Sequence, residues 1–240
     1  MEFRTEDGII VPAITAAQMR EVDRIAVEEF GLSILQMMEN AGRNLAENVI
    51  DMLDSARGEV TVLAGAGGNG GGGLCCARHL HNRGFKVWVV LDRDPSMLRE
   101  AAANQLNILQ AAGLQPADPT KASELMRRSQ IVVDALIGYS LRGAPQGKAA
   151  ALIDLCNQHA ARVLSLDVPS GLHATTGAAP GLMVRPERTL TLALPKSGLT
   201  NVEGELCLAD IGIPPEVYHR LGLSFEPPFE KDYWIRLVVG

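Results

Sequence analysis

The chain has 240 residues and a mass of 25.7 kDa, which suits one hydrophobic core and is too short for two full-sized domains. It carries 28 acidic against 22 basic residues, a net charge of −6, and only 4% aromatic residues. Nucleic-acid binding relies on a basic surface and stacking aromatics, so this composition argues against it. The sequence contains neither an apolar run that could span a bilayer nor the pattern of a signal peptide. We therefore expect a cytoplasmic protein without a nucleic-acid or membrane partner.

Residues 14–57 are predicted to form two helices. Thr15 can cap the first helix, whose apolar positions recur at three- and four-residue spacing, and Gly31 ends it. Ser33 can begin the second helix, whose apolar face continues to Arg57-Gly58. Either helix could bury its apolar face on the rest of the molecule or complete a homodimer, and the sequence leaves both open.

From residue 58 onward, short apolar runs alternate with helical patterns. Five strands are predicted, at Val60–Ala64, Lys86–Leu91, Ile131–Ala135, Val163–Leu166 and Thr189–Leu194. Helices are predicted between them at Leu74–Arg83, Leu98–Ala112, Ala122–Arg128 and Lys148–His159. Continuous apolar strands that alternate with helices are typical of a parallel sheet covered on both faces.

The end of the chain is predicted to add one edge strand from Glu205 and then a Pro-rich tail over residues 215–240. The expected architecture is a single Rossmann-like, doubly wound α/β domain over residues 1–240. It has a mostly parallel sheet in an α/β core of residues 58–214, helices on both faces and two extra N-terminal helices. In such folds, ligands bind beyond the carboxyl ends of the strands.

A glycine-rich segment, Gly65 to Gly73, follows the first core strand and is predicted to form a loop that opens a helix at Leu74. Glycine allows the backbone to approach a ligand closely, and the exposed N–H groups and the helix dipole favour an anion. Gly65–Gly70 also satisfies G-x-G-x-x-G, and Asp92 ends the next strand, where a ribose-binding acid would lie. A nicotinamide-dependent oxidoreductase is therefore one interpretation, although the glycines continue past this fingerprint and little chain remains for a substrate domain.

Two aspartates, Asp134 and Asp167, lie at the ends of two further predicted strands. A carboxylate among apolar residues must be paired, hydrogen-bonded or bound to a cation, unless it caps its own turn. Asn69, Asp134 and Ser170 offer only oxygen ligands, which suit a hard cation rather than zinc. The four cysteines contain no Cys-x-x-Cys pair, and we interpret all of them as buried structural residues.

Seven motifs occur in a fixed order along the chain. They are Thr15–Met19, Met38–Arg43, the glycine-rich segment, Asp134–Gly138, Asp167–Leu172, Pro195–Leu199 and Asp210–Pro214. This ordered set resembles the NAD(P)H-hydrate epimerase family, the YjeF N-terminal domain, from about Ile14 to Pro214. The resemblance implies a metabolite-repair isomerase that interconverts the R and S epimers of NADH or NADPH hydrated at carbon 6 of the nicotinamide ring (NADHX or NADPHX). A separate ATP- or ADP-dependent dehydratase would then convert the S epimer back to NADH or NADPH.

The resemblance also implies the site residues. The substrate-binding residues would be Gly68, Asn69, Gly70, Gly71, Gly72, Gly138, Tyr139, Ser140, Leu141, Arg142, Gly143, Ala144 and Asp167. A potassium ion would be held by Asn69, Asp134 and Ser170.

The chemistry fits the two candidate catalytic residues, Asp167 and Asp134. Carbon 6 carries a hydroxyl beside the ring nitrogen, so loss of this hydroxyl leaves a nitrogen-stabilised cation that water can attack from either face. An acid that protonates the leaving oxygen and then deprotonates incoming water is worth about 10²–10⁴-fold. We assign this role to Asp167, and we assign Asp134 mainly to fixing the cation and the loop; the reverse assignment is open.

The chain departs from the usual family pattern at three positions. Gly68 replaces an asparagine, Gly72 replaces an aspartate, and His173 stands where the family usually has aspartate. Loss of the carboxylate at position 72 removes an acceptor that faces the ligand. A second interpretation is therefore a module of the same fold that binds a nucleotide-like ligand or a protein partner without turnover.

Overall fold

The computed structural model describes residues 2–54 and 58–240 of the chain. Within these residues the strands are β1 (Phe3–Thr5), β2 (Ile10–Val11), β3 (Glu59–Ala64), β4 (Lys86–Leu91), β5 (Ile131–Ala135), β6 (Val163–Leu166), β7 (Arg188–Leu192), β8 (Glu205–Ala209) and β9 (Trp234–Val239). The helices are α1 (Ala16–Glu28), α2 (Ile34–Met52), α3 (Gly68–Asn82), α4 (Glu100–Ala111), α5 (Ala122–Arg128), α6 (Gly147–His159) and α7 (Pro215–Arg220).

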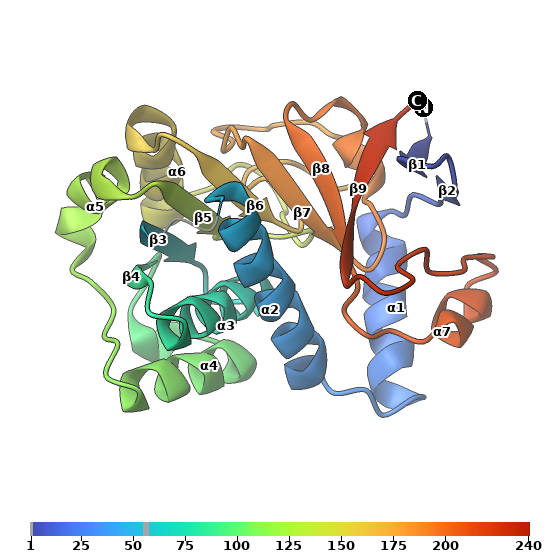
Figure 1. Cartoon of the computed structure of the whole chain (residues 1–240), viewed down its shortest axis with the longest axis horizontal. Helices are drawn as coiled ribbons and strands as arrows, with labels where there is room; N and C mark the ends of the chain where they lie inside the picture. The colour runs from blue at the N-terminus through green and yellow to red at the C-terminus, as the bar shows by residue number, and fades with distance from the viewer. Residues whose placement is uncertain (1, 55–57) are drawn as a thin grey trace.

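The strands form one mixed sheet in the order β2-β1-β9-β8-β7-β6-β5-β3-β4 (Figure 1). The six neighbours from β8 to β4 are parallel, whereas β9, β1 and β2 extend one side of the sheet in antiparallel pairing. The predicted α/β fold with a mostly parallel sheet is therefore confirmed.

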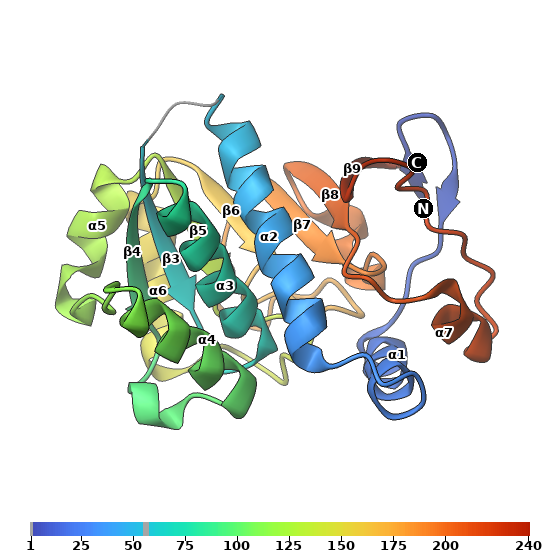
Figure 2. The same ribbon diagram turned by 60° about the horizontal axis from the view of Figure 1, so that its bottom comes forward.

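Helices cover both faces of the sheet. Helices α2, α3 and α4 lie side by side on one face, as Figure 2 shows, and their apolar residues pack on alternate side chains of the strands. Helices α5 and α6 cover the other face beside β5, and α1 and α7 pack on that face near β8. The apolar faces of α1 and α2 are thus buried within the chain itself.

The two N-terminal helices begin where the sequence predicts. The Thr15 and Ser33 hydroxyls each accept the N–H three residues on, and Gln18 and Gln36 complete two capping boxes. Helix α2 ends at Met52, because Asp54 adopts a positive φ of 48° that a helix cannot accommodate. The predicted end at Arg57-Gly58 lies partly outside the described residues, which exclude positions 55–57.

The glycine-rich segment is mostly helix rather than loop, which corrects the prediction. Helix α3 begins at Gly68, six residues before the expected Leu74. Glycine is a poor helix former, but the first turns of α3 press against the sheet. A Cβ at Gly73 would lie 2.6 Å from that of Ala135, and one at Gly70 would lie 1.7 Å from the Gly65 carbonyl oxygen. Close packing therefore selects glycine here and overrides its poor helix propensity.

The C-terminal prediction also needs correction. Strand β8 is not an edge strand, because it pairs with β7 on one side and with β9 on the other. The expected Pro-rich tail contains α7 and β9, and β9 in turn pairs with β1. The termini consequently meet: Glu2 and Gly240 exchange two backbone hydrogen bonds of 3.1 and 3.0 Å (Figure 1).

None of the helices within the described residues has the length and apolar character required to cross a membrane.

Candidate functional site

A cavity of about 1050 Å³ opens at the carboxyl ends of the parallel strands. Of the predicted substrate-binding residues, those that line it are Gly68, Asn69, Gly72, Gly138, Tyr139, Ser140, Leu141, Arg142, Gly143, Ala144 and Asp167. Gly70 and Gly71 do not line it, because Gly70 faces the Gly65 carbonyl and Gly71 faces Met38. The turn after β3 and the start of α3 therefore bring free N–H groups to the cavity wall.

Asp167 lies directly after β6, with its carboxylate in the cavity. Its backbone has a positive φ of 69°, and its N–H donates to the Leu190 carbonyl at 2.7 Å. The carboxylate is almost fully buried: Oδ2 accepts the Tyr139 N–H at 2.8 Å, and Oδ1 lies 2.5 Å from the Lys196 Nζ. Asp167 is thus held in one orientation by the loops after β5 and β7.

Lys196 is a site residue that sequence reasoning missed. Its side chain is 1% exposed, and its ammonium pairs with Asp167 and donates to the Leu192 carbonyl at 2.8 Å. A buried lysine is stable only when it is paired in this way. The available signal was a charged residue within Pro195–Leu199, a motif that supported the resemblance but to which no chemical role was given.

Asp23 of α1 also reaches the cavity and was missed. Its Oδ2 accepts a hydrogen bond of 2.5 Å from the Tyr139 hydroxyl. Burial raises the pKa of Asp23, against the lowering effects of the Tyr139 hydrogen bond and the Lys196 charge. Asp23 lies between Met19 and Ala26 on the apolar face of α1, and a carboxylate in that position was the signal that could have revealed it.

Asp134 is fully buried and does not line the cavity. Its carboxylate accepts the hydroxyl hydrogens of Ser165 at 2.8 Å and Ser170 at 2.5 Å, and the N–H groups of Ser170 at 2.9 Å and Leu136 at 3.3 Å. The Ser170 oxygen also accepts the Ile137 N–H at 2.8 Å. Burial raises the pKa of Asp134, and these hydrogen bonds oppose that rise. Asp134 therefore joins the loops after β5 and β6.

Asn69 has a buried polar atom beside Gly138 and Asp167. Its amide nitrogen has no hydrogen-bond partner among the described residues. A Cβ at Gly138 would lie 3.1 Å from the Asn69 Oδ1 and 2.9 Å from the Asp167 Oδ2, so both side chains approach the same glycine. Rotation of the amide exchanges its nitrogen and oxygen, which allows Asn69 to present an acceptor where no partner now lies. The oxygen donors near this point fit a hard monovalent cation.

Gly72 leaves room for a neighbouring apolar side chain. A Cβ at this position would lie 2.8 Å from the Leu166 Cδ2. A carboxylate at position 72 would therefore require Leu166 to move, so Leu166 and Gly72 fit each other in this chain.

Asp92, the expected ribose-binding acid, lies at the cavity but is already paired. Arg93 donates to both carboxylate oxygens, at 2.8 and 2.7 Å. In a dinucleotide-binding fold, the acid at this position accepts a hydrogen bond from a ribose hydroxyl. In this chain Arg93 already occupies both oxygens of that acid.

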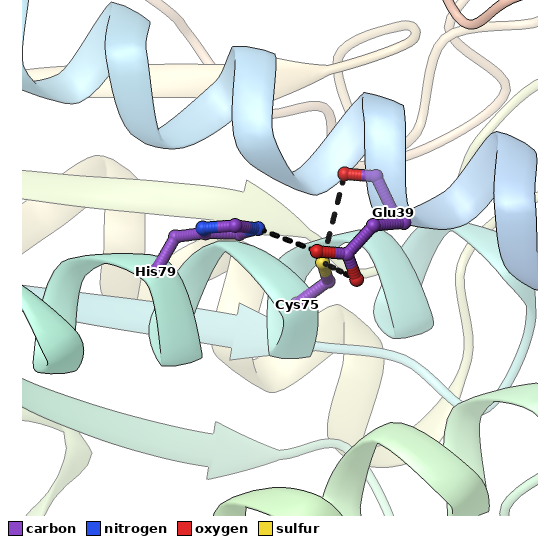
Figure 3. A group of neighbouring side chains, drawn as sticks. All are labelled: Glu39, Cys75 and His79. Carbon is purple, nitrogen blue, oxygen red and sulfur yellow. Dashed lines mark hydrogen bonds and ion pairs between the residues drawn. The ribbon is translucent and has the colours of Figure 1, made fainter.

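A second polar cluster joins α2 to α3 outside the cavity (Figure 3). Glu39 lies 2.8 Å from the His79 Nε2 and 3.3 Å from the Cys75 Sγ. These residues resemble a metal-ligand set, but the Arg78 guanidinium contacts both Glu39 and the Cys75 sulfur. Arg78 already balances the charge of the carboxylate and would repel a metal ion, so we assign the cluster to helix packing.

Comparisons with known proteins identify the family of this chain. Residues 34–198 match the family described as YjeF-related protein N-terminus. The chain is 51% identical to the NAD(P)H-hydrate epimerase of Dehalogenimonas lykanthroporepellens, over 100% of this chain and 98% of that protein. It is 38% identical to the bifunctional NAD(P)H-hydrate repair enzyme of Salinibacter ruber, over 89% of this chain but only 43% of that protein.

The fold also matches a solved structure. The crystal structure of yeast ynu0 superposes with a TM-score of 0.84 and covers 94% of this chain, at 21% identity. At that identity the likeness concerns the fold alone. From the matched residues and the identity to curated relatives, the chain belongs to the YjeF N-terminal family.

Proposed function

We propose that this protein is an NAD(P)H-hydrate epimerase, an isomerase that interconverts the R and S epimers of NADHX and NADPHX. The observation that carries the proposal is Asp167, whose carboxylate is fixed in the cavity between the Tyr139 N–H and the Lys196 ammonium. The curated relative with 51% identity over the whole chain bears the same activity in its name.

Different residues of the cavity would bind the substrate and transfer protons. The free N–H groups at Gly68 and Asn69, at the start of α3, would receive the pyrophosphate of the substrate. This would direct the nicotinamide ring toward Asp167, which would handle the proton of the hydroxyl at carbon 6 as a general acid and base. Asp134 would keep the loops after β5 and β6 in register rather than touch the substrate.

Potassium is the proposed cofactor, held by Asn69, Asp134 and Ser170. The Asn69 amide atom without a partner and the oxygen-only donor set support this assignment. When bound, the cation would supply positive charge beside the dinucleotide. The Asp134 oxygens already accept four hydrogen bonds. Asp134 would therefore contribute to cation binding partly by orienting the Ser170 hydroxyl.

A dehydratase is the proposed functional partner. The Salinibacter ruber relative is named as a bifunctional repair enzyme and extends well beyond the part matched here. A dehydratase that uses ATP or ADP and accepts only the S epimer would consume the product of this chain.

A coupled assay tests the proposal. A mixture of R- and S-NADPHX is incubated with an S-specific dehydratase and ATP, and absorbance follows the NADPH that is regenerated. We expect the R half to be recovered rapidly only when this protein is present. We expect Asp167→Asn to slow that recovery by about 10²-fold or more, with Asp154→Asn at an exposed position of α6 as the matched control. Binding of the hydrates without faster recovery would instead favour the non-catalytic module.

A further inference from the structure

Epimerisation requires proton transfer on both faces of the ring. The hydroxyl must leave carbon 6 from one face as water, and water must return to the other face. Each departure requires a proton donor and each return requires an acceptor. Asp167 and Lys196 can serve one face, because they form an ion pair of 2.5 Å at the cavity wall.

We propose that Tyr139 and Asp23 form a second proton-transferring pair, which serves the face of the nicotinamide ring opposite Asp167. This inference rests on the proposed epimerase function and assigns the groups that act on each face. Tyr139 would contact the reacting water, and Asp23 would act through the Tyr139 hydroxyl.

Tyr139 separates the two carboxylates within one cavity. Its backbone N–H donates to Asp167 at 2.8 Å, and its hydroxyl, at the far end of the side chain, donates to Asp23 at 2.5 Å. All three residues line the cavity. Asp23 comes from α1 and Asp167 from the loop after β6, so the carboxylates approach the cavity from different elements. A rigid aromatic side chain thus keeps the two acidic groups apart.

Three surrounding features suit this pair to exchange protons. Burial makes the protonated form of Asp23 easier to reach, since it raises the pKa of Asp23 above that of an exposed aspartate. Burial and the nearby Asp23 raise the pKa of Tyr139, which keeps its hydroxyl protonated at rest. The Lys196 Nζ lies 6.0 Å from the centre of the Tyr139 ring, so the positive charge of the first pair is also close to the second pair.

The proposed step balances in atoms and electrons. The leaving hydroxyl takes a proton from the Asp167–Lys196 pair, the bond between carbon 6 and oxygen breaks, and the ring-nitrogen lone pair forms a C=N bond. Water then attacks the opposite face, and the C=N electrons return to nitrogen. The Tyr139 oxygen takes a proton from that water as the Tyr139 hydroxyl proton passes to Asp23. The step leaves Asp23 protonated and the Asp167–Lys196 pair one proton short, which is the state that catalyses the reverse epimerisation. Proton exchange with water in the cavity resets both pairs for another forward turnover.

Oxygen exchange in H₂¹⁸O tests the proposal. Each epimer is incubated separately with the protein, the epimers are separated by chromatography, and mass spectrometry measures ¹⁸O in the retained and inverted product. The variants are Tyr139→Phe, which keeps the backbone N–H that holds Asp167, and Asp23→Asn. Asp154→Asn and Tyr233→Phe, both at exposed positions, are the matched controls.

We expect both variants to lose inversion by about 10²-fold, the low end of the range for proton transfer by a positioned side chain. Starting from the epimer whose hydroxyl faces Asp167, they should still exchange oxygen with retention, so the ratio of exchange to inversion rises at least tenfold. Starting from the other epimer, both processes should slow. Equal loss of exchange and inversion from both epimers, or no loss at all, would overturn the inference. A wild-type protein without activity would contradict the proposed function instead.

Discussion

At the scale of single residues, similar aspartates do different things because their surroundings differ. Asp134 lies near the end of β5 and Asp167 directly follows β6, so the sequence presents them as a matched pair. Asp134 is fully buried and accepts four hydrogen bonds, whereas Asp167 is held at the cavity by one N–H group and one ammonium. The first arrangement joins the loops after β5 and β6, and the second places a carboxylate at the cavity wall.

Replacing Asp134 should therefore affect stability strongly. In Asp134→Asn, the new NH₂ group would face two donors whichever oxygen it replaces: Leu136 and Ser170 at Oδ1, or Ser165 and Ser170 at Oδ2. Buried hydrogen bonds would therefore be lost. We expect the free energy of unfolding to fall by about 1–3 kcal/mol in urea titrations. Asp154→Asn, on the exposed face of α6, should leave it unchanged. Equal stability of both variants would contradict the role assigned to Asp134.

The potassium assignment makes a prediction at Asn69. Potassium chloride should raise both the epimerisation rate and the melting temperature of the wild-type protein, relative to lithium chloride at equal ionic strength. Asn69→Leu lacks the amide and should lose both responses, because the cation would lose an oxygen ligand. A wild-type protein that responds equally to both salts would show that potassium is not specifically bound.

At the scale of elements, the close approach of α2 and α3 depends on Gly42. A Cβ at this position would lie 2.4 Å from the Cys75 Cβ and 2.9 Å from the Gly72 carbonyl oxygen. Gly42→Ala should push the helices apart and lower the free energy of unfolding by about 1–3 kcal/mol. Gly68→Ala is the control, since a Cβ there meets no atom within 4 Å. Thermal unfolding of both variants checks this, and an unperturbed Gly42→Ala would contradict the packing described.

Strand β3 is tied to its neighbours by Glu59, whose contribution should depend on pH. Hydrogen bonds from Lys86 and Trp88, and the ion pair with Arg128, lower the pKa of Glu59 from 4.5 to about 2. The unfolded chain binds the proton more tightly, so this stabilisation is complete above pH 4.5 and is lost as pH falls toward 2.

The measurement is urea unfolding of wild type and Glu59→Gln across that range. We expect a difference of up to about 1 kcal/mol at pH 7, because these interactions are near the surface. The difference should vanish as the solution approaches pH 2. Glu203→Gln, at an exposed position before β8, is the control. A difference that stays constant with pH would show that charge is not the cause.

The elements also show what the sequence can and cannot predict. Strands β4, β5 and β6 match their predicted ranges, because buried parallel strands are continuous apolar runs. The start of α3 was mispredicted because close packing against the sheet, rather than helix propensity, chooses its glycines. Strand β9 is not predicted, because the prolines that precede it indicate an irregular tail. Its run Trp234–Val239 has ordinary strand composition but depends on pairing with β8 and β1.

At the scale of the whole molecule, the strand order assembles the cavity from segments that are distant in sequence. Most of the proposed substrate-binding residues line it, and sequence motifs were enough to find the loops after β3, β5 and β6. Asp23 and Lys196 carry only weak signals in the sequence, a carboxylate on the apolar face of a helix and a lysine within a motif. Their importance arises from contacts with Tyr139 and Asp167 across 116 and 29 residues, which only the folded chain reveals.

The most direct test of the account is the rate at which the purified protein converts a single epimer of NADPHX into the other. Chromatography of aliquots taken over time gives this rate against the spontaneous background. We predict equilibration well above background from either epimer, with loss of the acceleration in Asp167→Asn. A wild-type rate equal to the spontaneous rate, in potassium buffer and with the hydrate bound, would contradict the account.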